Sequence, residues 1–149
     1  MEKLPSESKT KSKYMVFQLG GQTYGTPILC VREVIEYKSP KPVPNVDHGF
    51  EGVINLRGEV IGVVDLRKVL KIAAPPPKCL MIFESGMGLM AAAVDKMLSV
   101  LEISAQDLET RENSGAKEGH EYFVGIGKTA IGLVTILDLN KIDILLKGS

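Results

Sequence analysis

The side chains that most often perform enzyme chemistry are few in this sequence and lie far apart. The two histidines, His48 and His120, sit in polar stretches, and neither has a second histidine at metal-ligand spacing. Asp65 and Asp138 each precede a short apolar segment, where capping of a helix start is enough to explain an aspartate. The string GIGKT at 125–129 lacks the first glycine of a phosphate-binding loop. We therefore expect no catalytic residue, no metal site and no bound cofactor.

The composition argues against nucleic acid and against a membrane surface as partners. Lys plus Arg number 18 and Asp plus Glu also number 18, so the chain lacks the basic excess that binds phosphate groups or anionic lipid. Aromatic side chains, on which bases stack, are only 5% of the residues. No apolar segment is long enough for a membrane span, and Cys30 and Cys79 lack CxxC spacing. These features predict a cytoplasmic protein with reduced cysteines and no direct membrane insertion.

The first half of the sequence predicts a polar tail followed by short strands. Residues 1–13 are too polar to pay for ordering and should form a loose tail. The segments 14–19 and 22–28 are rich in apolar residues and flank two glycines, a pattern typical of a β-hairpin. The segment 51–70 predicts a strand, a turn, a second strand and one helical turn capped by Asp65.

Two further elements of this half can be predicted from spacing. Thr26-Pro27 is a suitable helix start, and Val31, Val34 and Ile35 recur at three and four residues, which predicts a short amphipathic helix. The strand at 60–64 is apolar on both faces, so we expect it to be covered on both sides, as in a small closed barrel packed against a neighbour.

The second half repeats the pattern of the first after a proline run at 73–77. Strands are predicted at 79–83, 88–94, 122–127 and 130–136, with a polar loop at 110–121. Val16-Phe17 and Ile82-Phe83 lie 66 positions apart, Ile61-Gly62 and Ile131-Gly132 lie 70 apart, and Asp65-Leu66 and Asp138-Leu139 lie 73 apart. We therefore predict two small barrels side by side: subdomain 1 at about 14–74, subdomain 2 at about 78–136, and a helix at 138–147 packing back.

Arg57 is the residue that turn chemistry alone explains least. It stands at the apex of a turn between two apolar strands, next to Gly58, where Asn or Asp would be commoner. Such an arginine suits recognition of a partner, although a turn charge also often points into solvent or pairs with a nearby glutamate. The same two interpretations apply to Glu33, and Val31 and Val34 fit either a core or an exposed contact surface.

The string GVINLRGEVIGVVDLRKVL at 52–70 closely resembles the signature of the CheW-like domain family, found in bacterial chemotaxis coupling proteins and in the regulatory domain of the histidine kinase CheA. YMVFQLGGQTYGTPI near the start and VGIGKTAIGLVTILDLNKI at the end support the resemblance, which extends over about 130 residues. It implies a mainly β fold of two five-stranded SH3-like barrels with a few short helices. Because 149 residues leave no room for the kinase's other segments, we expect the free-standing adaptor.

The family resemblance also implies partners and contact residues. Its adaptors bridge the cytoplasmic hairpin tip of methyl-accepting chemotaxis receptors to the CheA regulatory domain, at membrane-associated receptor arrays, and catalyse nothing. The expected receptor-facing residues are Val31, Glu33, Val34, Gly52, Arg57 and Gly58. The expected kinase-facing residues are Cys79, Leu80, Met81 and Ile82, where like-folded barrels would meet edge to edge.

Two other classes of function stay open at this point. A small-barrel module that binds nucleic acid or a small ligand is the main alternative, against which the neutral charge and scarce aromatic residues speak. An enzyme with an unrecognised site is the other, and it would need a polar pocket that the sequence does not indicate.

Overall fold

The chain forms two β-sheets with only short helical turns between their strands. The computed structural model describes residues 11–44, 49–86, 88–110 and 122–142. The strands are β1 (Lys11–Leu19), β2 (Gln22–Pro27), β3 (Val31–Glu36), β4 (Phe50–Leu56), β5 (Glu59–Asp65), β6 (Cys79–Ser85), β7 (Gly88–Val94), β8 (Lys96–Ser104), β9 (Leu108–Thr110), β10 (Phe123–Thr129) and β11 (Gly132–Leu137). The helical turns are η2 (Ile28–Cys30), α1 (Leu66–Val69), η3 (Ala105–Asp107) and η4 (Leu139–Lys141).

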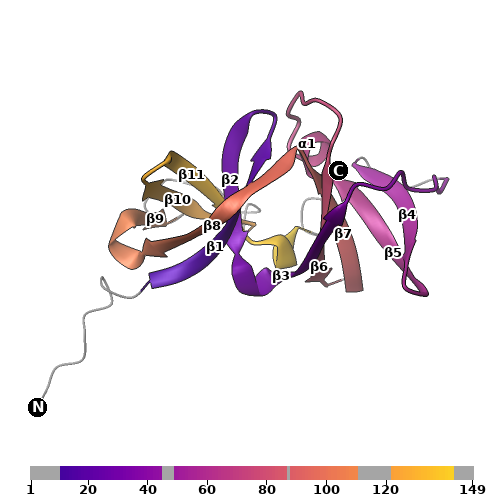
Figure 1. Cartoon of the computed structure of the whole chain (residues 1–149), viewed down its shortest axis with the longest axis horizontal. Coiled ribbons are helices and arrows are strands. Elements are labelled where there is room, and N and C mark those ends of the chain that lie inside the picture. The colour runs from indigo at the N-terminus through magenta and orange to yellow at the C-terminus, as the bar shows by residue number, and fades with distance from the viewer. Residues whose placement is uncertain (1–10, 45–48, 87, 111–121, 143–149) are drawn as a thin grey trace, which may run out of the picture.

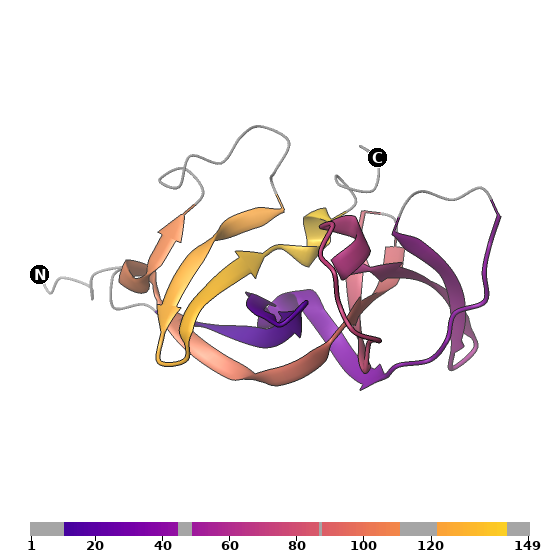
Figure 2. The ribbon, with the colours of Figure 1, turned by 90° about the horizontal axis from the view of Figure 1, so that it is seen from above.

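The two sheets lie side by side along the long axis of the molecule (Figures 1 and 2). Sheet A has six strands in the order β8-β1-β2-β11-β10-β9, and sheet B has five in the order β3-β6-β7-β5-β4. The predicted mainly β fold with two SH3-like subdomains is confirmed, although β9 adds a sixth strand to sheet A and the strand orders are open.

Each sheet combines strands from both halves of the chain. The hairpin β1–β2 lies in sheet A between β8 and β11, whereas the hairpin β6–β7 lies in sheet B between β3 and β5. The halves thus exchange their first hairpins, as Figure 2 shows for β1 beside β8. The predicted boundaries at 14–74 and 78–136 therefore do not separate the subdomains, because sheet B is formed by residues 31–94 and sheet A by residues on both sides of that segment.

The pairing register shows that the two halves are structural repeats. Val34 on β3 lies opposite Met81 on β6, and 66 positions later Val100 on β8 lies opposite Met15 on β1. Both pairings contain a register shift at the same place. The β4–β5 hairpin matches β10–β11 at an offset of 73, where Phe50 opposite Val64 becomes Phe123 opposite Leu137. The suggested match of Ile61-Gly62 with Ile131-Gly132 at 70 was therefore wrong in register.

The segment after β2 is a strand and not the predicted amphipathic helix. Val31–Glu36 pairs with β6, and its exposure alternates from residue to residue. Only η2 is helical in this region, over three residues. The three apolar residues, Val31, Val34 and Ile35, are all β-branched, and such side chains favour a strand. A helix as short as the predicted one also has little stability of its own. The three- and four-residue spacing arose by coincidence.

Both ends of the chain differ from the predictions where they are described. Strand β1 begins at Lys11, so the last three residues of the predicted tail at 1–13 are paired with β8. At the other end, the described part of the predicted helix at 138–147 contains a 3-10 turn at Leu139–Lys141, which Asp138 caps by accepting a hydrogen bond from the Asn140 amide at 3.0 Å. Residues 1–10, 111–121 and 143–149 lie outside the described residues.

Sheet B is covered by apolar side chains on both faces, as predicted for its strand at 60–64, where Ile61 and Val63 lie in one cluster and Val64 lies in the other. Along β7, Ala91 and Ala93 face the interior of the sheet's own curl, while Met90, Ala92 and Val94 face sheet A. Sheet A has a smaller interior cluster of its own. The cluster between the sheets holds Phe17, Leu19, Val64, Leu66, Met81, Phe83, Met90, Ala92, Val94, Leu137, Leu139 and Ile142. The exception is Val60, which is 71% exposed because it lies at the free end of the β4–β5 hairpin.

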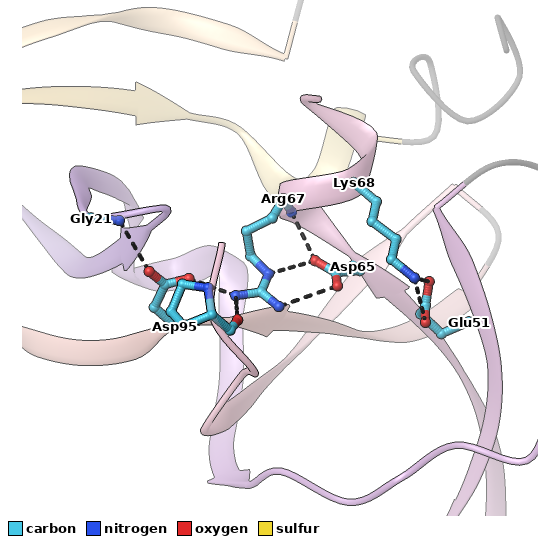
Figure 3. A network of polar contacts seen from close by, with 7 residues as sticks. Gly21, Glu51, Asp65, Arg67, Lys68 and Asp95 are labelled. Atoms are coloured by element: carbon cyan, nitrogen blue, oxygen red, sulfur yellow. Dashed lines mark hydrogen bonds and ion pairs between the residues drawn. The ribbon is translucent and has the colours of Figure 1, made fainter. Parts of the chain in front are cut away.

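A buried arginine fixes the junction between the sheets (Figure 3). Arg67 on α1 is 4% exposed, and its guanidinium donates to Asp65 Oδ1 at 2.6 Å and to Asp95 Oδ1 at 2.6 Å. It also donates to the Pro75 carbonyl at 3.0 Å. Asp95 lies where β7 passes into β8, and its other oxygen accepts from the Gly21 amide at 3.1 Å. Arg67 thus links the end of β5 to the β1–β2 turn across the two sheets.

The electrostatics of this cluster favour the charged form of Arg67. Burial lowers the pKa of Arg67, but the hydrogen bonds that it donates to Asp65 and Asp95, together with their charges, outweigh burial and leave that pKa above its usual value. Arginine does not lose its proton in folded proteins, so the cation is permanent. A buried ion pair of this kind is costly to break from one side, because the partner charge is then left without compensation.

We predict that Arg67→Met lowers the free energy of unfolding by about 3 to 5 kcal/mol, because it leaves Asp65 and Asp95 buried without a cation. Urea unfolding followed by circular dichroism measures this loss. Lys68→Met is the matched control, because the Lys68–Glu51 ion pair is largely exposed and should contribute at most about 1 kcal/mol. Equal losses in the two variants would contradict the role given to Arg67.

Candidate protein-docking surface

The turn between β4 and β5 has the conformation that the sequence predicts for Gly58. Arg57 has φ 50° and Gly58 has φ 89°, so both central residues are left-handed, as in the turns that suit the twist of a hairpin. The Asn55 side chain accepts a hydrogen bond from the Gly58 amide at 3.0 Å. An arginine with positive φ is uncommon, and this backbone directs Arg57 outward, where its side chain is 69% exposed.

Arg57 forms an ion pair with Glu33, which unites two of the predicted receptor-facing residues. Glu33 lies on β3, at one edge of sheet B, and Arg57 follows β4, at the opposite edge. The pair therefore joins the two edges of the curled sheet across its mouth. Glu33 is the more covered partner, with 33% of its side chain exposed. Because the guanidinium is so exposed, the pair itself adds little to stability.

The other predicted receptor-facing residues fall into two groups. Val34 is 36% exposed, whereas Val31 is half-buried against the cluster between the sheets. Gly52 is buried and has φ 136°, and a Cβ there would lie 2.1 Å from the Lys41 carbonyl oxygen. Its equivalent in the second repeat, Gly125, has the Glu109 carbonyl at 2.2 Å. The prediction that Gly52 itself faces a partner is therefore wrong: the backbone of a neighbouring segment occupies that space.

The predicted kinase-facing residues do not form a surface. Leu80 and Met81 are fully buried and Ile82 is 2% exposed, and only Cys79 is half-buried. Strand β6 lies between β3 and β7, so both of its edges are already paired. Direct contact of Leu80, Met81 and Ile82 with a partner is excluded in this fold. The side chains of the apolar run at 79–83 alternate between two buried clusters: Met81 and Phe83 lie in the one between the sheets, and Leu80 and Ile82 lie in the one inside sheet B.

The structure exposes several apolar side chains that the sequence analysis did not predict, among them Leu29 and Val60. Leu29 on η2 is 96% exposed and lies beside a cleft of about 340 Å³ that Arg32, Glu84 and Asn140 help to line. Val60 lies two residues after Gly58 and is 71% exposed. Leu29 could not have been found by pattern, because it follows from the 3-10 turn that replaces the predicted helix. Val60 could have been found, since residues near a hairpin turn reach beyond the packed sheet.

A second polar contact tethers the passage from sheet A into sheet B. The Cys30 thiol donates to Asp138 Oδ1 at 3.6 Å, just before β3 begins. Burial raises the pKa of this thiol, and the Asp138 carboxylate raises it further. Cys30 is therefore held as a neutral donor, which suits a structural role better than that of a nucleophile.

The described residues hold no group of three or more His, Cys, Asp or Glu that could bind a metal ion. In the same part of the chain, no helix has the length and apolar character needed to span a bilayer. The mouth of sheet B presents the Arg57–Glu33 ion pair, and sheet B also exposes the apolar side chains of Val34 and Val60. Such a combination suits contact with another protein.

Gly52→Ala should lower the free energy of unfolding by at least about 3 kcal/mol, because it adds a backbone clash to a strained φ. Gly58→Ala is the matched comparison: its φ is also positive, but nothing lies within 4 Å of the added Cβ, so we expect a loss of about 1 to 2 kcal/mol. Denaturant unfolding of both variants tests the difference. A smaller loss for Gly52→Ala than for Gly58→Ala would show that the close approach of Lys41 is unimportant.

Asp138→Asn should speed alkylation of Cys30 at pH 8 in a Cys79→Ala background. Removing the carboxylate lowers the thiol pKa, so more thiolate is present at that pH. The rate of iodoacetamide labelling is the measurement, and the whole pH profile should move to lower pH. A faster rate with an unmoved profile would mean that the variant merely opened the site.

Comparisons with known proteins agree with this architecture. Residues 13–144 match the family model described as the CheW-like domain. The chain is 34% identical to a chemotaxis protein CheW of Thermotoga maritima, over 85% of this chain and 83% of the relative. It is 28% identical to one of Bacillus subtilis, over 93% and 91%. A crystal structure of the scaffolding protein CheW from Thermoanaerobacter tengcongensis superimposes with a TM-score of 0.78 at 28% identity, covering 88% of this chain and 91% of that one.

These matches are to proteins named as chemotaxis proteins and as a scaffolding protein. They support a role as a non-enzymatic scaffold in chemotaxis. The chain belongs to the CheW-like domain family.

Proposed function

We propose that this chain bridges the cytoplasmic hairpin tip of methyl-accepting chemotaxis receptors to the regulatory domain of the kinase CheA. The observation that carries the proposal is the oriented Arg57–Glu33 pair, which stands exposed at the mouth of sheet B in a chain of this family. The role requires a cytoplasmic protein that is recruited to membrane-associated receptor arrays. It needs no reaction, since coupling is achieved by two simultaneous contacts.

The receptor contact would combine apolar burial with charge orientation. A receptor tip is a hairpin of two antiparallel helices, and a helix of this kind presents an apolar stripe with charges along its flanks. Val34 and Val60 offer exposed apolar area on sheet B, while Arg57 and Glu33 offer one charge of each sign. Such pairs fix the orientation and the association rate of a complex more than its raw affinity. The receptor-facing set we propose is therefore Val31, Glu33, Val34, Arg57 and Gly58, joined by Val60.

The kinase contact would use a different part of the molecule from the one first predicted. Edge-to-edge contact between like-folded sheets needs a strand with a free edge, which β6 lacks. The strands at the ends of the two sheets are β3 and β4 in sheet B, and β8 and β9 in sheet A. Because β3 carries receptor-facing residues and Arg57 directly follows β4, the kinase domain would meet one of the ends of sheet A, which leaves both contacts free to form together.

Arg57→Ala should weaken binding of a receptor-tip fragment by about 5- to 30-fold, which corresponds to about 1 to 2 kcal/mol, while the melting temperature stays unchanged. The reason is that an exposed guanidinium at a turn contacts a partner and packs against nothing. Isothermal titration gives the affinity. Lys68→Ala removes a comparable exposed ion pair elsewhere and should leave binding unchanged. Identical affinities for the two variants would remove Arg57 from the site.

Co-sedimentation tests the bridging role as a whole. The full chain should pull down a receptor-tip fragment and a CheA regulatory fragment separately, and both at once when all three are mixed. Arg57→Ala should weaken the receptor arm and leave the kinase arm intact. Competition between the two fragments for the chain would contradict the proposal, because a bridge requires that both bind at once.

A further inference from the structure

We propose that the β1–β2 hairpin can be exchanged between two copies of this chain, so that each copy completes sheet A of the other. The partner is thus a second copy of the chain, and the interface is the seat between β8 and β11 that the hairpin occupies within one molecule. The inference concerns self-association and does not depend on the proposed role in chemotaxis.

The seat holds the hairpin through non-covalent contacts that a second copy would reproduce. Strand β1 pairs with β8 from Lys11 to Gln18, and β2 pairs with β11 at Tyr24 and Gly25. Val16, Phe17 and Leu19 on the hairpin are all fully buried. A hairpin that leaves its seat exposes these side chains to water. Binding to a vacant seat of the same shape is therefore strongly favourable, because it buries that apolar surface again.

A single short segment joins the hairpin to the rest of the molecule. This hinge is η2, Ile28–Cys30, which contains no buried residue and carries the 96% exposed Leu29. Pro27, immediately before it, has φ −54° and ψ 136°, an extended conformation that a straightened hinge would keep. Short hinges are typical of chains that exchange an element between copies, because straightening them relieves the turn that closes the monomer.

The chain already places a hairpin of one repeat in the sheet of the other. The equivalent hairpin of the second repeat, β6–β7, occupies the same kind of seat in sheet B, between β3 and β5. The register is the same in both seats, with Val34 opposite Met81 and Val100 opposite Met15. Each sheet is thus completed by a hairpin from the other repeat. Reciprocal exchange between two copies repeats this arrangement for sheet A with the same contacts and changes only the hinge.

Concentration decides between the two forms. The closed monomer has the advantage that its hairpin is tethered beside its own seat, which acts as a high local concentration. The exchanged dimer keeps the same contacts, so its population increases when the chain refolds at high protein concentration or when the hinge cannot turn back. Native chain folded at low concentration should be monomeric and should convert slowly, because exchange requires the hairpin to leave its seat.

Cysteine trapping tests the exchange directly. In a background of Cys30→Ala and Cys79→Ala, Met15→Cys and Val100→Cys are placed in separate copies that carry different affinity tags. The copies are refolded together at millimolar concentration and then oxidised. Met15 and Val100 are direct cross-strand partners, at a spacing that a disulfide accepts. Exchange predicts a cross-linked pair of copies, at least about tenfold more abundant than in the same mixture refolded at micromolar concentration.

The control mixture pairs Met15→Cys with Leu133→Cys, an exposed position on β11 that is not a partner of Met15. A double variant that carries Met15→Cys and Val100→Cys in one copy should form the bond within the chain at low concentration, which shows that the site accepts it. Cross-linking no greater than in the control mixture would overturn the proposal.

Hinge length gives an independent measurement on the full chain. Deleting Ile28 and Leu29 should shift the refolded chain toward the dimer in light-scattering chromatography, because the shortened segment cannot turn back. Inserting two glycines at the same point should do the opposite. An equal dimer fraction in the two variants would overturn the proposal.

Discussion

The structure depends on one buried cation held between two buried anions. Arg67 keeps its charge, so the folded chain must place Asp65 and Asp95 beside it. Arg67 lies on α1, Asp65 lies at the end of β5, and Asp95 lies between β7 and β8. Asp95 also accepts from the β1–β2 turn, which brings sheet A to the same point. Apolar clusters bind the sheets without direction, whereas this cluster sets where they meet. Because the cluster fixes how sheet B sits against sheet A, it also fixes the side of the molecule on which Arg57 is exposed.

The sequence predicted the elements best where one local interaction decides them. The glycine turns, the caps at Asp65 and Asp138 and the alternation of the apolar strands each depend on neighbouring residues, and the structure has them where expected. The amphipathic helix failed for the opposite reason. Val31–Glu36 becomes a strand because β6, almost fifty residues away, pairs with it. The same dependence on distant partners makes Leu80, Met81 and Ile82 a double-sided core strand instead of a docking surface.

The candidate site was predictable in its residue types but not in its arrangement. Arg57 was singled out because turn chemistry does not call for an arginine, and Glu33 because its segment matched a family pattern. Their ion pair could not be predicted, since it joins the opposite edges of a sheet whose curl depends on all five strands. Gly52 was singled out as a contact residue, but the structure gives a different reason for a glycine there. The Lys41 carbonyl oxygen occupies the space that a side chain would need. Arg67 was missed because Asp95, its second carboxylate partner, lies 28 positions away in the sequence.

The two sheets differ in when they become possible as the ribosome releases the chain. Sheet B is built from residues 31–94 alone, so it can assemble while the remainder is still being translated. Sheet A needs β1 and β2, which precede sheet B in the sequence, and β11, which follows it and ends at Leu137. The β1–β2 hairpin is therefore translated before the strands β8 and β11 that flank it, so Phe17 and Leu19 lack part of their packing until those strands have been made.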